Sequence, residues 1–184
     1  MLNALRLIAR GIDGLNEAIG RSVAWLSLLM VLVTFLVVVL RYGFHAGSIA
    51  LQESVMYMYA FLFMLSAAYA LKHDGHVRVD IIYNKLSTRA QAWVDLFGSL
   101  FFLLPTFLFI GFASFGYVSA SWRLREGSPE TGGLPYIYVL KSAILLLAAL
   151  MVLQGLSQAI KALLVIAGRD TGALRHTREA QDQV

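Results

Sequence analysis

Few residues of this 184-residue chain could do chemistry, and their positions exclude most kinds of reaction site. The absence of cysteine excludes disulfides, thiol catalysis and cysteine-ligated metals or clusters. A haem-bearing membrane anchor needs histidines that face each other within apolar helices. All four histidines lie outside the long uncharged stretches, at positions 45, 73, 76 and 176. We therefore expect no cofactor and no enzymatic activity.

One short segment gathers possible metal ligands around a turn. His73, His76 and Asp80 lie close together in the sequence, on either side of Asp74-Gly75. Ligands scattered over a tight turn are weak evidence, because structural metal sites hold their ligands at recognisable spacings. We interpret the segment as a polar turn between two helices and expect no metal.

Two ionisable residues lie near the same predicted end of the helices. Glu53 begins the second uncharged stretch and Lys141 precedes the fourth. A charge at the centre of a bilayer costs about 2.5–3.5 kcal/mol on insertion scales, and less toward the ends. Two interpretations of Lys141 stay open: its amine snorkels outward, or it forms an intramembrane ion pair with Glu53. Neither residue by itself indicates a transport site.

The elements that position these groups are membrane helices. The chain is 59% hydrophobic and 14% charged, whereas soluble domains are about 25% charged. Four stretches of 18 or more residues contain no Asp, Glu, Lys or Arg. About 20 such residues cross a hydrocarbon core, and only a helix satisfies their backbone there. We predict an all-α integral membrane protein with four transmembrane helices at about 22–40, 49–71, 93–119 and 134–164.

Local signals refine these helices. Pro105 should kink the third one, because proline removes a hydrogen bond of the ladder. Thr88 and Gln91 fit a capping box at its start. Two further segments, near 2–20 and 79–92, have one apolar and one polar face, which is typical of amphipathic helices at the membrane interface.

The chain forms a single membrane domain over 1–184 in this interpretation. Residues 1–21 are its N-terminal amphipathic segment, and 168–184 are a polar tail that we expect to be flexible and cytoplasmic. Eleven of the 15 lysines and arginines fall in the two terminal segments and the second connection. The positive-inside rule then places both termini in the cytoplasm. Since the formal charge of +4 follows this topology, we expect membrane lipid as a partner and no nucleic acid.

A stand-alone transporter needs a polar path through the membrane and a pair of interrupted helices. The apolar stretches of this chain contain neither. The residues alone therefore indicate a membrane scaffold or accessory subunit. Two alternatives remain: a cofactor-carrying membrane anchor of a redox complex, and a stand-alone four-helix membrane protein.

Three motifs resemble the small membrane subunit of the tripartite ATP-independent periplasmic (TRAP) transporters. The most specific follows the second helix, where Gly75, His76, Arg78 and Asp80 match a Gly-His-[Val/Ile]-Arg-[Val/Ile]-Asp pattern. The others are Leu40-Arg41-Tyr42, and Gly132-Gly133-Leu134-Pro135 with the later Leu153-Gln154-Gly155. The sequence departs from the family at Ala50, where many members have tryptophan.

The resemblance implies a subunit of a multi-pass transporter in the bacterial inner membrane. A periplasmic solute-binding protein would deliver an organic acid to a large membrane subunit, which would carry the substrate and sodium sites. This chain would scaffold that subunit. The resemblance also implies transient docking of the binding protein at the outer surface, for which the candidates are Arg123, Arg125, Glu126 and Glu130.

Overall fold

The computed structural model describes residues 2–73, 83 and 86–168, and all the regular structure in these ranges is helical. Its elements are α1 (Leu2–Gly43), α2 (Ile49–Lys72), α4 (Thr88–Phe97), the π-helix η1 (Gly98–Leu103), α5 (Leu104–Leu124) and α6 (Ile137–Ile166). Because α4, η1 and α5 follow one another without a gap, they form one long rod. The four rods are long and apolar enough to span a membrane, which confirms the predicted four-helix class.

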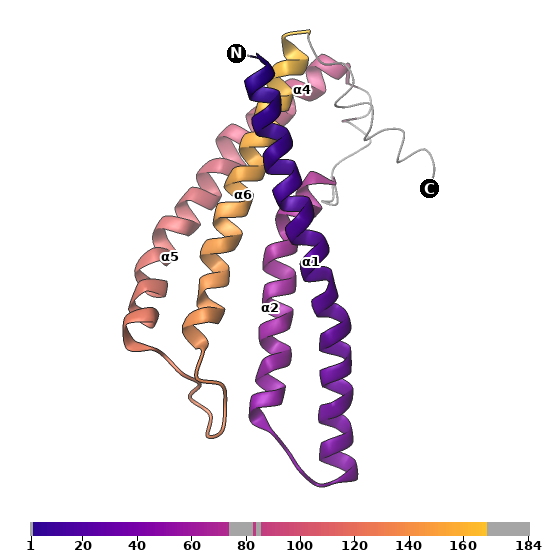
Figure 1. Ribbon diagram of the computed structural model, residues 1–184. Helices are drawn as coiled ribbons and strands as arrows, with labels where there is room; N and C mark the ends of the chain where they lie inside the picture. The colour runs from indigo at the N-terminus through magenta and orange to yellow at the C-terminus, as the bar shows by residue number, and fades with distance from the viewer. Residues whose placement is uncertain (1, 74–82, 84–85, 169–184) are drawn as a thin grey trace.

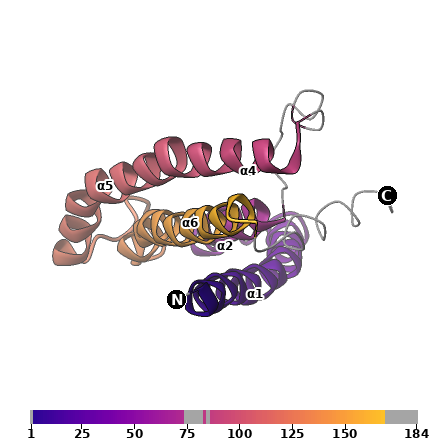
Figure 2. The same cartoon turned by 90° about the horizontal axis from the view of Figure 1, so that it is seen from above.

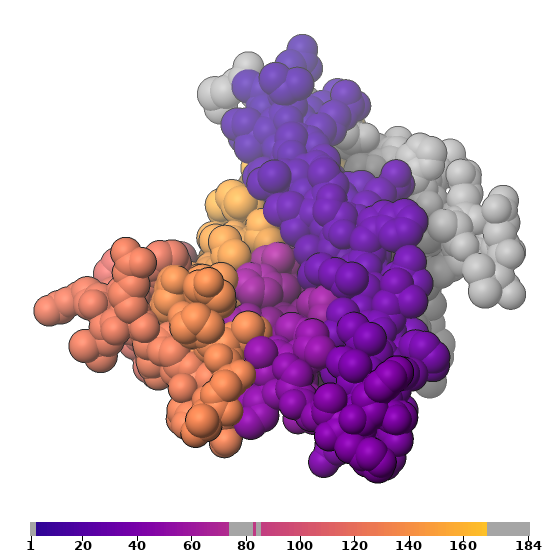
Figure 3. Space-filling model, turned by 60° about the horizontal axis from the view of Figure 1, so that its bottom comes forward, coloured from indigo at the N-terminus to yellow at the C-terminus, as the bar shows by residue number. Residues whose placement is uncertain are grey.

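The rods form two hairpins (Figure 1). One consists of α1 and α2, and the other of the α4–η1–α5 rod and α6. Helix α6 contacts all the other elements, and in Figure 2 it lies with α2 between α1 and the α4–η1–α5 rod. Connections 44–48 and 125–136 lie at one end, called here the hairpin end. Toward that end the two hairpins separate into two arms (Figure 3).

The apolar core lies around the second half of α6. One cluster joins α4 to the end of α6, and another joins the end of α2 to the middle of α6. Small side chains at Ala148, Ala159 and Ala162 are buried there. Small residues let membrane helices approach closely, which explains why α6 is the central element.

Helix α1 replaces two elements that were predicted separately, the amphipathic helix near 2–20 and the membrane helix at about 22–40. Instead of a separate helix near 2–20, the structure has one helix of 42 residues that continues through the apolar stretch. Leu7, Ile8 and Leu15 are exposed, whereas Ala9 and Asn16 are buried. The face that carries polar side chains is thus turned toward α2 and α6. In the predicted segment at 79–92, positions 79–82, 84 and 85 lie outside the described residues, and the last five residues belong to α4.

The start of α4 corrects the predicted capping box. The N-cap is Ser87, whose hydroxyl accepts a hydrogen bond from the Ala90 N–H at 3.3 Å. Gln91 does not reach back to the cap, because its amide donates to the Tyr83 carbonyl at 2.9 Å. The choice of Thr88 was therefore wrong by one residue.

The irregularity predicted at Pro105 takes the form of the π-helical turn just before it. The Leu104 N–H donates to the carbonyl of Ser99, five residues earlier. A proline ring crowds the carbonyl four residues before it, here that of Phe101. The wider π turn relieves that contact while keeping the rod continuous. Leu103, at the end of this turn, packs against Gly155 of α6.

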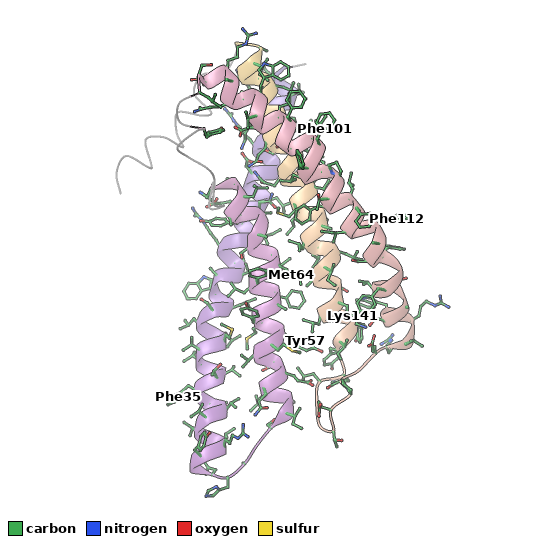
Figure 4. All side chains as sticks on the ribbon, turned by 180° about the vertical axis from the view of Figure 1, so that it is seen from behind. Phe35, Tyr57, Met64, Phe101, Phe112 and Lys141 are labelled. Atoms are coloured by element: carbon green, nitrogen blue, oxygen red, sulfur yellow. The ribbon has the colours of Figure 1, made fainter. Side chains whose placement is uncertain are left out.

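Large apolar side chains cover the outside of the rods. Phe35 on α1, Phe101 on η1 and Phe112 on α5 point away from the bundle (Figure 4). Phe112 is 85% exposed. In water such a surface would aggregate, so lipid or other membrane-embedded protein has to cover it.

Candidate functional site

Two clusters of polar side chains lie between the helices, one toward each end of the bundle. The N-terminal cluster consists of Asp13, Asn16, Glu17, Lys72, His73, Gln154, Ser157 and Lys161. The hairpin-end cluster consists of Glu53, Ser121, Glu126, Ser128 and Lys141.

Asp13 is the centre of the contact between α1 and α6. Its Oδ2 lies 2.5 Å from the Lys161 amine. Its Oδ1 accepts hydrogen bonds from the Ser157 hydroxyl at 2.8 Å and from the Gln154 amide at 3.3 Å. The carboxylate thus has both a counter-charge and neutral donors, as a partly buried charge requires.

Asn16 extends this network into the interior. Its Nδ2 donates to Gln154 Oε1 at 2.6 Å. The direction of this bond follows from the neighbouring one: since the Gln154 amide nitrogen donates to Asp13, its oxygen is left to accept from Asn16. Both side chains are buried, at 1% and 0% exposure. An amide pair in such a place fixes how α1 and α6 are aligned along their length.

Glu17 joins α1 to the end of α2. One of its oxygens, Oε2, lies 2.6 Å from the Lys72 amine and 2.8 Å from His73 Nε2. The other oxygen accepts from Arg21 at 2.7 Å, one turn along the same helix. Lys72 also donates to the Asp13 carbonyl at 3.2 Å. These bonds anchor the last turn of α2 against α1.

A close contact between the same two helices lies one turn further along. Gly20 packs against Tyr69, and a methyl group at Gly20 would lie 2.5–2.6 Å from three atoms of the tyrosine. The Tyr69 and His73 rings are 4.4 Å apart, centroid to centroid. Because the side chain of Tyr69 fills the space next to Gly20, glycine is required there.

At the hairpin end Lys141 has a partner other than Glu53, the residue named in one of its two open interpretations. Its amine lies 2.6 Å from Glu126 Oε2, rather than against Glu53, and 4.0 Å from the centre of the Tyr117 ring. The physical reason is the end of α5, where Arg125 adopts a left-handed conformation with φ 47°. This residue reverses the chain and directs Glu126 back toward α6. Bonds from Lys141 and the Ser121 hydroxyl lower the pKa of Glu126 below its ordinary value of 4.5.

Glu53 binds the loop instead. It accepts one hydrogen bond from the Ser128 hydroxyl and another from the Leu134 N–H, the latter at 2.6 Å. Both donors belong to the 125–136 connection, whereas Glu53 belongs to α2. A charged acceptor with two donors makes a strong link between the two hairpins.

The separation between the clusters has a simple measure. Lys141 and Lys161 are 20 residues apart on α6, and Glu53 and Lys72 are 19 apart on α2. At 1.5 Å per residue, each separation is about 30 Å. This is the thickness of a bilayer's hydrocarbon core. The two clusters therefore have the spacing of the two membrane interfaces.

The other predicted site residues have different surroundings. Arg123, Arg125 and Glu130 are exposed at the hairpin end, while Glu126 is held by Lys141. The turn residues Gly75, His76, Arg78 and Asp80 lie outside the described residues. Among the residues that are described, no group of three or more His, Asp or Glu could hold a metal ion.

Sequence reasoning missed the N-terminal cluster. It interpreted residues 2–20 as an amphipathic helix at the membrane interface, whereas Asp13 and Glu17 on its polar face contact neighbouring helices. A usable pattern was present on α6, where polar residues recur at helical spacing: Gln154, Ser157, Gln158 and Lys161. A polar stripe at the end of a central helix indicates polar partners on its neighbours.

Comparison with known proteins decides the family. A family model described as "Tripartite ATP-independent periplasmic transporters, DctQ component" matches residues 30–165, most of the chain. This chain belongs to the DctQ family. It is 29% identical over 140 residues to a protein of Haemophilus influenzae named as a TRAP transporter small permease protein. The alignment covers 74% of this chain and 85% of that protein. No solved structure matches the chain.

Membership of the DctQ family makes this chain the small permease subunit of a TRAP transporter, which is a transporter component. It argues against the cofactor-carrying redox anchor. The matched range contains the hairpin-end cluster and the α6 half of the N-terminal cluster. It begins after Asp13, Asn16 and Glu17, so the partners on α1 lie before the part that the family model recognises.

Proposed function

We propose that this chain is the static scaffold of a sodium-coupled transporter that takes up an organic acid delivered by a periplasmic binding protein. In this proposal it packs beside the large membrane subunit in the bacterial inner membrane, with both termini in the cytoplasm. It binds neither the substrate nor sodium. It enlarges the static scaffold of the transporter, and the moving part of the large subunit slides against that scaffold.

The arrangement of the charged side chains supports a scaffold most directly. At the two membrane levels, the carboxylates of Asp13, Glu17 and Glu126 are each paired with a lysine of another helix or across a loop. The stretches between these levels, 54–71 on α2 and 142–160 on α6, contain no Asp, Glu, Lys, Arg or His. Since a transport path needs polar groups through the depth of the membrane, these helices are suited to support and not to conduction.

The exposed apolar faces support a partner within the membrane. On α5, Phe109, Phe112 and Phe115 are among the most exposed side chains of the described residues. Lipid and the large subunit together have to cover the outside of the rods. Polar clusters that hold the helices together at both ends leave these faces free for that purpose.

Reconstitution tests the proposal. Proteoliposomes would contain this chain alone, the large subunit alone, or both, with purified binding protein and labelled organic acid outside. We expect uptake driven by a sodium gradient only where both membrane subunits are present. Sodium-driven uptake by this chain alone would show that it carries its own transport site and is not a scaffold.

The hairpin end is the proposed docking surface for the binding protein. Arg123, Arg125 and Glu130 are exposed there, and Leu124 is 79% exposed between the two arginines. Delivery requires a complex that forms and dissociates quickly. Charges at the rim of an interface increase the rate of encounter more than they hold a complex together, which suits this task.

A further inference from the structure

The loop at the hairpin end has a shape fixed by its own hydrogen bonds. The Ser128 N–H donates to the Leu134 carbonyl at 3.0 Å, which closes the loop across its base. The Gly133 N–H donates to the Glu130 carbonyl at 3.0 Å, and the Glu130 N–H donates to the Ser128 hydroxyl at 3.1 Å. Ser128 is thus bonded through its backbone and its side chain.

Glu53 enters this loop from α2. Its two oxygens bind the two residues at the base of the loop, the Ser128 hydroxyl and the Leu134 N–H. Without Glu53 the Leu134 N–H would lose its acceptor in a half-buried position, where an unsatisfied donor is costly. The carboxylate therefore stabilises the closed loop at both sides of its base.

Gly133 shows how tightly the carboxylate fits. A methyl group there would collide with the Ser128 side chain and would lie 2.7 Å from Glu53 Oε1. Glycine is therefore needed where the loop passes over the carboxylate. The loop, the serine and the glycine together form a fitted receptor for one side chain of α2.

We propose that Glu53 is a positioning residue that holds the 125–136 loop in the shape that the binding protein meets. It also couples this loop to the α1–α2 hairpin, so the two arms of the hairpin end present one surface. The inference rests on the proposed docking at this end. Because the surface is formed in advance, no loop has to become ordered during each encounter, which lowers the free-energy cost of binding.

The test uses the assembled transporter with a nitroxide label on a Thr131→Cys variant of this chain, whose natural sequence has no cysteine. Glu53→Met removes both acceptors while keeping a side chain of similar length. We expect a more mobile label spectrum and a several-fold higher binding-protein concentration for half-maximal uptake. Maximal uptake and co-purification with the large subunit should be unchanged.

Two more variants separate a local effect from a general loss of folding. Ser128→Ala removes one donor to Glu53 and the acceptor of the Glu130 N–H but leaves the bond from Leu134 to Glu53, so its effect should be in the same direction. Gln52→Met changes an exposed neighbour of Glu53 and should change neither measurement.

The outcomes distinguish this inference from the docking proposal. An unchanged label spectrum in Glu53→Met would overturn the role of Glu53 in holding the loop. A mobile loop with an unchanged half-saturating concentration would overturn its role in docking. Where charge reversal of Arg123 and Arg125 raises that concentration but Glu53→Met does not, docking stands and Glu53 loses its role. Where neither raises it, docking at this end fails as well.

Discussion

Asn16 of α1 and Gln154 of α6 form a 2.6 Å hydrogen bond in the interior of the bundle, 138 positions apart in the sequence. The Gln154 amide also donates to Asp13, and Asp13 pairs with Lys161. One chain of bonds therefore runs from the buried amide pair to a charged pair near the end of α6. Removing either amide leaves the other without this bond, whereas Asp13 keeps Ser157 and Lys161 as partners if Gln154 is removed. The bonds therefore specify the position of α1 against α6.

Asn16→Leu should destabilise the protein by about 1–3 kcal/mol, because Gln154 Oε1 is left buried without a donor. The double variant with Gln154→Leu should lose less than the two single changes together, since it removes both unpaired groups. Unfolding midpoints in detergent for the four proteins of this cycle would measure the coupling. Strictly additive losses would contradict an interaction between the two amides.

Gly20→Ala should destabilise the contact of α1 with α2 by about 1–3 kcal/mol, because the new methyl group meets the Cβ and ring of Tyr69. The matched control is Gly14→Ala on the same helix, where nothing lies within 4 Å. That variant should be neutral or gain up to about 1 kcal/mol from helix propensity. Thermal unfolding in one detergent compares the two, and equal stability would show that the helices do not meet at Gly20.

The elements of this fold follow from the sequence because the bilayer restricts them. Long uncharged stretches have to be helices, and that gave all four membrane rods. What sequence patterns could not supply was the direction of the polar faces. Asp13 and Glu17 have the spacing of a solvated stripe, and only the neighbouring Lys161 and Lys72 show that the stripe is internal.

The hairpin end shows the same limit. Glu53 and Lys141 lie at the same level, so an ion pair between them was a reasonable expectation from charge alone. The left-handed conformation of Arg125 decided otherwise by bringing Glu126 to the lysine. A reversal at a residue other than glycine leaves little trace in one sequence. Glu53 was then free to bind the loop.

The 125–136 loop should lose protection against hydrogen exchange at acid pH, because Glu126 becomes protonated. Its pKa is lowered in the folded protein by the bonds from Lys141 and Ser121. The stabilisation is therefore present above the ordinary value of 4.5 and is lost as the pH falls through the lowered pKa. Hydrogen exchange of residues 125–136, measured from about pH 7 down to pH 3 and corrected for intrinsic rates, should show this loss. Glu126→Gln should have weaker protection at neutral pH and a smaller further loss on acidification than the parent.

The predicted orientation can be tested with reporter fusions. Fusions after Gly47 and Gly127 should report the periplasm, and fusions after Gly75 and Asp170 should report the cytoplasm. The reason is the excess of lysine and arginine in the terminal segments and the second connection. The two polar clusters would then mark the two interfaces. A cytoplasmic signal at Gly127 would show that the α5–α6 hairpin has the opposite orientation, and the proposed docking surface would then not face the periplasm.

Reversing Arg123 and Arg125 to glutamate should raise the binding-protein concentration needed for half-maximal uptake. The two side chains are exposed at the end of α5, where their charge attracts a partner but does not hold the fold together. Assembly with the large subunit should be unchanged, and the effect should shrink at high salt, because ions screen exposed charges. Conservative Arg→Lys changes at both positions keep the charge and should behave like the parent. Equal uptake by the double reversal and the parent, at every binding-protein concentration and at low salt, would show that these arginines do not dock the binding protein.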